Sequence, residues 1–360
     1  MTQMSFGVIK RTVLVVFGCL ALAGLAQAQD DLVEVCFQSK WFPQAQFAGY
    51  FVAQELGYYA EEGLEVTVLD GGNVNPTVQV ASGNCDFGTD WIANMLVQRD
   101  NGLEVVKIAQ IYQAAGYRMV ALNDSGIETF ADMAGRRVGV WGFGNEFVSQ
   151  AIFAAEGLTS DLNPEVTDAD VETVVYAFDP ALVFPDEVEV ASVMTYNELN
   201  QVVGLGFELD GLTIFNPADI DADLLEDLIF TTPELLATED FKGSGLSGVE
   251  VAERFLRATI RGWEYAVANQ DEAVFIVVGM CGDTCNGSGS TQSPLIHQTW
   301  QMARVAELVA PSEDTMIGSM DQAAFDRSIE LLLEVGLISD VIAFEDVVDT
   351  SVYEAATGGM

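Results

Sequence analysis

The stretch Trp41–Val66 reads WFPQAQFAGYFVAQELGYYAEEGLEV and follows a short apolar run, Val33–Phe37, that is typical of a first β-strand. Pro43 stands where a helix would begin, because its fixed φ suits the first turn and its missing N–H is not needed there. Gly57 is free to adopt the left-handed conformation that ends many helices. The pattern therefore predicts a strand followed by a helix from Pro43 to Gly57.

This predicted helix is apolar nearly all round, and its narrow polar sector holds Gln54 and Glu55. A helix of this kind is covered on most sides by the rest of the protein, so we expect its C-terminal half to pack in a core. Its first turn, from Trp41 to about Tyr50, follows the end of a strand. Open α/β sheets bind ligands at such positions, and we expect this turn to form one wall of a cleft.

The N-terminal residues 1–28 have the pattern of an export signal. Lys10 and Arg11 precede an apolar run over residues 12–26, and Ala26-Gln27-Ala28 supplies the small residues of a cleavage site. The run is shorter than the ~20 residues of a membrane-spanning helix. Cys19 lies in a weak match to a lipoprotein acylation site, so a lipid anchor stays open as the alternative. We expect an exported protein, periplasmic or extracellular.

The chain is strongly acidic, with 14 Lys and Arg against 55 Asp and Glu and a net charge of −41. Removal of residues 1–28 takes away two basic residues, which leaves 12 against 55, or −43. Like charge repels nucleic acid and anionic lipid surfaces, so neither is an expected partner. The acidic residues are scattered, which indicates a solvated acidic surface, and we hypothesise an adaptation to a saline medium.

The cysteines that follow residue 28 allow disulfides in an exported protein. Cys281 and Cys285 lie in a Gly/Ser/Asn-rich loop, where we favour a small disulfide ring. A zinc site would need two further ligands, and His297 is the one histidine of the chain, so we predict no metal site. Cys36 and Cys85 would lie on neighbouring strands, where a disulfide and two free thiols are both open.

Strands alternate with helices along the chain, which predicts an α/β fold with parallel-rich mixed sheets in two lobes and a ligand cleft between them. We expect residues 29–115 and 227–360 to form the first lobe and residues 116–226 the second. The expected strands are 33–37, 64–70, 85–88, 103–112, 117–122, 138–141, 171–177 and 189–194. The expected helices are 43–57, 76–82, 91–99, 145–156, one from 195, 249–269, 272–278, 294–309 and 322–336. Thr89 or Asp90 would cap the third of these helices, and Asn145 the fourth.

Signatures of catalysis are scarce. His297 lies in the middle of a predicted helix, and no Ser/His/Asp or Cys/His arrangement can be built without it. Glu146 and Glu198 lie in first helical turns, where the helix dipole favours acidic residues whether or not they have a function. We therefore predict no catalytic residue, no cofactor and no enzyme activity, although either carboxylate can accept a hydrogen bond from a ligand.

Aromatic residues follow the ends of several predicted strands in both lobes. A cleft with aromatic faces and a few polar groups suits a flat heterocycle, which stacks on rings and is fixed by hydrogen bonds at its edge. A sulfonate would call for Arg or Lys, and only Lys40 and Arg118 are close in sequence. The predicted ligand-binding residues are Trp41, Gln44, Tyr50, Asp90, Trp91, Tyr112, Trp141, Gly144, Asn145, Glu146, Tyr196, Asn197 and Glu198.

Five ordered motifs, at residues 41–49, 57–63, 81–88, 138–146 and 194–198, resemble the thiamine-pyrimidine-precursor/riboflavin type of ABC transporter substrate-binding protein, in the SsuA/THI5-like, NMT1-like superfamily. The resemblance runs through nearly all of the chain after residue 28. It implies a type II periplasmic-binding-protein fold, a small-molecule ligand clamped between two lobes, and an ABC permease and ATPase as partners. We expect the protein itself to be a monomer.

The same superfamily includes a fungal synthase of the thiamine pyrimidine, hydroxymethylpyrimidine phosphate. Its activity draws on an active-site histidine, a lysine that holds pyridoxal phosphate and a cysteine-rich iron motif. Gln44, Gln46 and Phe47 stand where that histidine would be expected, and no clustered cysteine motif matches. We therefore expect a binding protein for a thiamine pyrimidine precursor or a riboflavin-like compound. The alternatives are the synthase and a binding protein for another solute, such as a sulfonate.

Overall fold

The computed structural model describes residues 32–72, 74–142, 144–282, 285 and 292–358. The expected export signal and Cys19 therefore lie outside the described residues. Within the described ranges, none of the helices combines the length and the apolar character needed to span a membrane.

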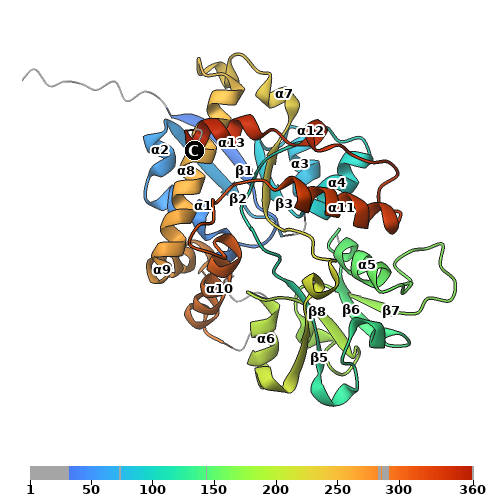
Figure 1. Ribbon diagram of the computed structural model, residues 1–360. Helices are drawn as coiled ribbons and strands as arrows, with labels where there is room; N and C mark the ends of the chain where they lie inside the picture. The colour runs from blue at the N-terminus through green and yellow to red at the C-terminus, as the bar shows by residue number, and fades with distance from the viewer. Residues whose placement is uncertain (1–31, 73, 143, 283–284, 286–291, 359–360) are drawn as a thin grey trace, which may run out of the picture. The chain divides into compact units, whose positions relative to one another are not determined.

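The first sheet begins with the strand that precedes Trp41. β1 (Val33–Gln38) pairs in parallel with β2 (Leu64–Leu69) on one side and with β3 (Phe87–Asp90) on the other. β10 (Leu228–Thr231) lies between β3 and β4 (Val106–Gln110) and is antiparallel to both. The order is β2-β1-β3-β10-β4, so the chain returns to this sheet after it has built the second one (Figure 1).

The second sheet has the order β7-β6-β8-β5-β9. β6 (Arg137–Trp141) is parallel to β7 (Glu172–Tyr176) and to β8 (Val190–Met194). β5 (Tyr117–Leu122) is antiparallel to β8 and to β9 (Leu212–Phe215). Each sheet therefore contains one reversed strand among strands of a single direction, and the predicted α/β class with two parallel-rich mixed sheets is confirmed.

Helices cover the faces of both sheets, because strands buried on both faces need apolar helix surfaces against them. They are α1 (Ala48–Glu55), α2 (Tyr58–Glu61), α3 (Pro76–Ala81), α4 (Ile92–Asp100), α5 (Glu146–Ala155), α6 (Glu198–Gly204), α7 (Pro233–Leu236), α8 (Gly248–Ala268), α9 (Gln270–Cys281), α10 (Pro294–Val309), α11 (Gln322–Glu334), α12 (Phe344–Val347) and α13 (Thr350–Thr357). The predicted bounds of α10 and the start of α11 are met. The strands β9 and β10 and the short helices α2, α7, α12 and α13 were not predicted.

The crossing of α1 over α8 fixes the position of the turn from Trp41 to about Tyr50, which is the expected first wall of the cleft. A Cβ at Gly49 would lie 2.2 Å from the ring of Trp263, and a Cβ at Gly262 would lie 2.2 Å from the Gly49 carbonyl oxygen. Only glycine permits so close an approach of two helices. Phe255, two turns earlier on α8, stacks on Phe87 of β3 with ring centroids 4.5 Å apart. The C-terminal half of the predicted opening helix thus packs in the core, as expected.

The predicted start of the opening helix is wrong. Pro43 precedes the helical residues, Gln44 is fully extended at φ −165° and ψ 175°, and a 3-10 turn, η1 (Ala45–Phe47), leads into α1. The N–H of Ala45 is bonded to Gln298 Oε1 at 2.7 Å, so a side chain from α10 satisfies the start of this turn. The predicted end is right, since Gly57 adopts φ 77°.

One predicted helix cap is also wrong, and a second is met in position only. Thr89 and Asp90 belong to β3, which begins two residues later than predicted, and Trp91 is the N-cap of α4. The Asp90 carboxylate binds Lys40 and makes no side-chain cap of α4. Asn145 is the N-cap residue of α5, as predicted, but its side chain donates to the Gly142 carbonyl at 2.9 Å and makes no cap hydrogen bond.

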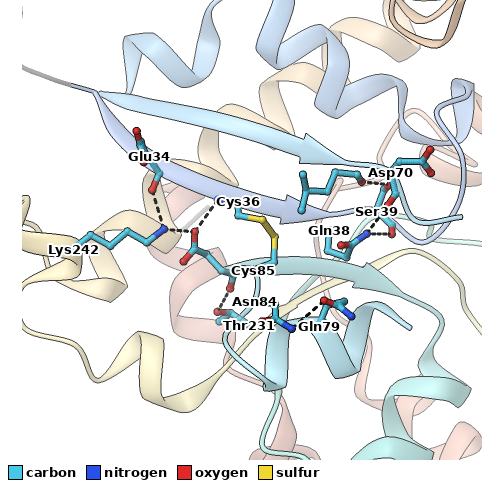
Figure 2. Close-up of a disulfide and its surroundings, with 12 residues drawn as sticks. Glu34, Cys36, Gln38, Ser39, Asp70, Gln79, Asn84, Cys85, Thr231 and Lys242 are labelled. Carbon is cyan, nitrogen blue, oxygen red and sulfur yellow. Dashed lines mark hydrogen bonds and ion pairs between the residues drawn. A yellow bond between two sulfur atoms is a disulfide. The ribbon is translucent and has the colours of Figure 1, made fainter. Parts of the chain in front are cut away.

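Two disulfides are present. Cys36 of β1 is joined to Cys85, which lies just before β3, and Cys281 is joined to Cys285. Figure 2 shows the first of these together with Lys242. Asp86 Oδ2 accepts the Cys36 N–H and the Lys242 ammonium, both at 2.7 Å. The disulfide therefore ties two neighbouring parallel strands at the end opposite to the aromatic residues.

Candidate functional site

A pocket collects the ends of strands from both sheets. It is lined by Lys40, Trp41, Gln44, Gln46, Trp91, Trp141, Asn145, Met194, Tyr196, Asn197 and Glu198. Its cavity measures about 20 Å³, which is room for about one water. The lining side chains therefore leave little free space between them.

The aromatic lining comes from equivalent places in the two sheets. Trp41 and Trp91 follow β1 and β3, while Trp141 ends β6 and Tyr196 follows β8. The indole rings of Trp91 and Trp141 meet edge to face, with centroids 6.4 Å apart. Because the carboxyl ends of parallel strands share one edge of a sheet, residues far apart in sequence gather here.

Three polar atoms of the lining have no hydrogen-bond partner among the described residues. They are Nε1 of Trp91, Nε1 of Trp141 and Oδ1 of Asn145, on side chains that are 6%, 4% and 4% exposed. A buried polar group without a partner costs about 1–3 kcal/mol. Two donors and one acceptor are thus held in the pocket wall at an energetic cost that a ligand with complementary groups would remove.

The positive charge of the pocket is already paired. Lys40 Nζ lies 2.8 Å from Asp90 Oδ1, and these side chains are 5% and 0% exposed. The second oxygen of Asp90 accepts hydrogen bonds from Thr77 and Asn94. Lys40 also lies 5.3 Å from the centre of the Trp91 ring, a cation–π distance. Lys40 therefore contributes little net positive charge to a ligand.

Glu198 is the acidic group of the lining. Its Oε2 accepts the Met194 N–H at 3.0 Å, and its Oε1 accepts the Asn197 side-chain amide at 2.6 Å. Burial raises the pKa of Glu198 to about 7. Near neutral pH the wall that carries Glu198 is therefore poised between a carboxylate and a neutral acid, and both forms retain acceptor oxygens.

Behind the lining, one face of α10 is polar and fully buried. His297, Gln298 and Gln301 are all 0% exposed. Gln301 Nε2 donates to Gln44 Oε1 at 3.0 Å and to Asn197 Oδ1 at 2.9 Å. These bonds join a residue that follows β1 to a residue that follows β8, so α10 connects the two walls of the pocket.

Another buried acid, Asp227, lies behind Gln44 and Gln46. Gln46 donates to Asp227 at 2.9 Å, and Gln44 donates to Gln46 Oε1 at 2.7 Å. Burial is the main cause that raises the pKa of Asp227 to about 7, and the bond from Gln46 opposes it. The two glutamines of the opening stretch are thus held in place from behind.

The structure brings eight of the predicted ligand-binding residues together in the pocket lining: Trp41, Gln44, Trp91, Trp141, Asn145, Tyr196, Asn197 and Glu198. Five others lie outside it. Asp90 does not line the pocket itself but binds two residues that do, Lys40 and Trp91. Tyr50 and Tyr112 are core residues in edge-to-face contact with Trp263. Gly144 donates its N–H to Glu146, whose side chain lines a separate crevice. The role of the eight as ligand contacts stays a prediction.

Sequence reasoning missed Lys40, Gln46 and Met194 as lining residues, and it missed the buried face of α10. One signal was available for that face: His297, Gln298 and Gln301 lie on one side of a helix whose neighbouring positions are Met302 and Val305. Polar residues at core positions of a helix need partners, so this pattern indicates a buried network.

Several known proteins are similar to this chain. Riboflavin-binding protein RibY of Chloroflexus aurantiacus is 29% identical over 325 residues, which cover 87% of this chain and 84% of that protein. The formylaminopyrimidine-binding protein of Halalkalibacterium halodurans is 26% identical and covers 76% of this chain and 78% of its own length. The 4-amino-5-hydroxymethyl-2-methylpyrimidine phosphate synthase of Legionella pneumophila is 26% identical. The similarity covers 65% of this chain and 69% of that protein.

Solved structures of low sequence identity share the fold. The periplasmic aliphatic sulphonate binding protein SsuA of Escherichia coli has a TM-score of 0.60 at 11% identity, over 89% of this chain and 92% of its own. A ligand-binding component of an ABC-type import system from Staphylococcus aureus also has a TM-score of 0.60 at 11% identity, over 90% of this chain and 99% of its own. The expected periplasmic-binding-protein fold is thereby confirmed. The model of the family described as NMT1/THI5 like matches residues 44–273, well over half of the chain, and the protein belongs to that family.

Proposed function

We propose that this protein is the solute-binding component of an ABC importer and works outside the cytoplasmic membrane. It binds a small flat heterocycle, either a thiamine pyrimidine precursor or a riboflavin-like compound, and delivers it to a permease and its ATPase. Membership of the NMT1/THI5-like family and the two relatives named as binding proteins support this proposal.

The observation that carries the proposal is the pairing of aromatic faces with unpartnered polar atoms in one pocket. Trp91 and Trp141 each offer a ring and an indole N–H, and Asn145 offers an amide oxygen. A heterocycle with ring nitrogens or carbonyls next to an amino or imide N–H complements this set. Stacking on the rings adds the apolar part of the binding energy.

The charge of the pocket argues against a sulfonate. Lys40 is paired with Asp90 at 2.8 Å, and the remaining ionisable lining residue is Glu198. Arg118 does not line the pocket, and its guanidinium donates to the carbonyls of Ala115 and Tyr117. An anion would lose its hydration here without gaining a free cation, a cost that proteins normally avoid.

The synthase alternative is disfavoured by how the candidate residues are held. His297 is buried between amides, and Gln44 and Gln46 occupy the first wall in a closed network. Lys40, the lysine of the lining, is already bound to Asp90. None of these side chains is placed to carry a reactive group.

The proposal is tested with a binding panel by calorimetry and thermal shift. The panel contains riboflavin, 4-amino-5-hydroxymethyl-2-methylpyrimidine, its formylamino analogue and an alkanesulfonate. A ligand at 100 times its Kd stabilises the folded protein by about 2.7 kcal/mol, which gives a measurable rise in Tm. We expect saturable binding of one of the heterocycles and none of the sulfonate. Binding of the sulfonate alone would contradict the proposal, as would pyrimidine product formed by the protein with iron and pyridoxal phosphate.

A further inference from the structure

His297 is the one histidine of the chain, and it lies in a polar contact between α10 and the turn that leads into α6. Its Nδ1 is 2.9 Å from Asn200 Nδ2, and its Nε2 is 2.8 Å from Asn197 Oδ1. The amide nitrogen of Asn200 can only donate, so Nδ1 accepts. The ring proton is therefore on Nε2, which donates to Asn197.

The direction of this bond fixes the next one. Because Asn197 Oδ1 accepts from His297 and from Gln301, its amide nitrogen is turned to the other side. There it donates to Glu198 Oε1 at 2.6 Å. When Glu198 is a carboxylate, a reversed amide would place Oδ1 against its oxygen, where two acceptors repel. The tautomer of His297 thus determines the orientation of the Asn197 amide, and through it the hydrogen bond to Glu198, an acidic residue of the pocket lining.

We propose that His297 is a positioning residue of the binding site, which fixes Asn197 so that Glu198 presents its acceptor oxygens to an N–H group of the ligand. The proposal rests on the function proposed above, because it concerns a ligand held between these walls. It assigns an amino or imide N–H of the heterocycle to the wall formed by the turn before α6.

The surroundings of His297 keep its imidazole ring neutral, with a single ring proton. Asn197, Asn200 and Gln301 face the ring, and all three are uncharged amides. Burial lowers the pKa of His297 to about 4. The ring is therefore neutral from pH 5 to 8 and carries one proton, with which Nε2 donates to Asn197.

The proposal is first tested without any ligand. With ¹⁵N-labelled histidine, and with the chain expressed without a polyhistidine tag, the ring of His297 gives one pair of nitrogen resonances. We expect the Nε2–H tautomer alone between pH 5 and 8. A mixture of tautomers, or protonation near pH 6.5, would overturn the proposal.

The second test uses three variants on α10. His297→Leu removes both hydrogen bonds, His297→Gln keeps one donor and one acceptor, and Ile296→Ala changes an exposed neighbour as the control. Asn200 keeps its bond to Gln292 and Asn197 keeps its bond to Gln301, so the leucine variant is expected to fold. The probes are riboflavin and 4-amino-5-hydroxymethyl-2-methylpyrimidine.

We expect His297→Leu to weaken binding of the probe by about tenfold or more, the effect of one buried polar group left unpaired. His297→Gln should restore affinity to within about threefold of the wild type, and Ile296→Ala should change nothing. A folded leucine variant with wild-type affinity would refute the positioning role, as would a glutamine variant no better than leucine.

A failure of the proposed function is recognised separately. If the wild type binds neither probe, the positioning role is judged from the Asn197 side-chain amide, assigned with Asn197→Ser. We expect its protons to be protected from exchange in the wild type and in His297→Gln, and exposed in His297→Leu. An amide that is equally protected in the leucine variant would overturn the inference whatever the ligand is.

Discussion

Glu226 accepts the backbone N–H of Gly116 at 2.8 Å with one carboxylate oxygen, and it accepts the N–H of Tyr117 at 3.0 Å with the other. Gly116 lies on the segment by which the chain leaves the first sheet, and Glu226 lies on the segment by which it returns. The side chain is 0% exposed. A buried acid thus joins the two segments that connect the sheets.

This relationship predicts how stability depends on pH. Burial is the main cause that raises the pKa of Glu226 from 4.5 to about 8. Between these values the folded protein keeps a proton that the unfolded chain has released, so the free energy of unfolding falls as pH rises. Glu198 and Asp227, with pKa values raised to about 7, act in the same direction. Urea denaturation should therefore give a higher stability at pH 5 than at pH 7.

The range ends at pH 7 because Lys107, whose pKa burial lowers from 10.5 to about 7, makes the free energy of unfolding rise with pH above that value. Within the range His297 also acts in the opposite direction, since burial lowers its pKa from 6.5 to about 4, but it is one group against the three acids. Glu226→Gln is the control for the pH effect. We expect this variant to be less stable than the wild type, since one of the two N–H donors loses its acceptor, but with a flatter pH dependence from 5 to 7. An unchanged slope would show that Glu226 is not the source.

The buried pair of Lys40 and Asp90 predicts a large effect of removing one partner. Lys40→Met should lower the free energy of unfolding by roughly 3 kcal/mol, the lower end for a broken buried ion pair, because Asp90 keeps bonds from Thr77, Asn94 and the Trp91 N–H. The double variant Lys40→Met/Asp90→Asn should recover part of the loss, since no charge is left unpaired. A double variant that is less stable than Lys40→Met would contradict this account.

The unpartnered indole N–H groups of Trp91 and Trp141 predict variants that lose ligand affinity but keep the free energy of unfolding. Trp91→Phe and Trp141→Phe keep a ring but remove a donor that has no partner among the described residues. We expect little change in the free energy of unfolding and a five- to tenfold weaker binding of the heterocycle, the usual worth of about 1 kcal/mol for one hydrogen bond. Trp263→Phe is the matched control, since Trp263 is equally buried but outside the pocket. Equal losses in all three variants would remove the indole N–H groups from recognition.

The two disulfides should contribute unequally. Cys36–Cys85 spans 49 positions of sequence and Cys281–Cys285 spans 4. In the chain-entropy account, cross-linking the longer loop is worth about 4 kcal/mol and the shorter about 2 kcal/mol. Cys36→Ser/Cys85→Ser and Cys281→Ser/Cys285→Ser, compared by urea denaturation, should rank in this order. Gln298 donates to the Cys285 carbonyl and accepts the N–H of Ala45. A larger loss of stability for the second pair would therefore indicate that its disulfide supports Gln298 and, through Gln298, the turn at Ala45.

Much of the fold could be predicted because it depends on local patterns. The strand Tyr117–Leu122 and the helix Pro294–Val309 have clear periodicity and clear ends, and both were predicted to the residue. The start of the opening helix failed for a non-local reason. Gln44 is extended because its side chain meets Gln301, which is distant in sequence, and propensity carries no information about such a partner.

The residues of the candidate site also divide into those that local patterns indicate and those that depend on tertiary contacts. Trp41, Trp91 and Tyr196 could be found because strand ends are visible in the sequence, and the structure places them in one pocket. Tyr50 and Tyr112 were included because an aromatic residue near a strand end has the same signature whether it faces a cleft or a core. The sequence predicts no catalytic role for His297 and does not indicate its contact with Asn197, because that contact depends on the tertiary approach of α10 to the turn before α6.

The acidic composition predicts a stability that rises with salt. A net charge of −41 repels itself in the compact state, and screening shortens the reach of that repulsion from about 10 Å at 0.1 M to about 3 Å at 1 M salt. We expect the Tm to increase from low salt through the molar range of NaCl and of KCl alike. The variant Glu313→Gln/Asp314→Asn/Glu330→Gln removes three exposed negative charges. It should be more stable than the wild type at low salt and gain less from added salt, because less repulsion remains to be screened. A wild-type Tm that is flat or falls with salt would contradict the saline hypothesis, and a variant with the same salt increment would show that specific ion binding rather than screening is responsible.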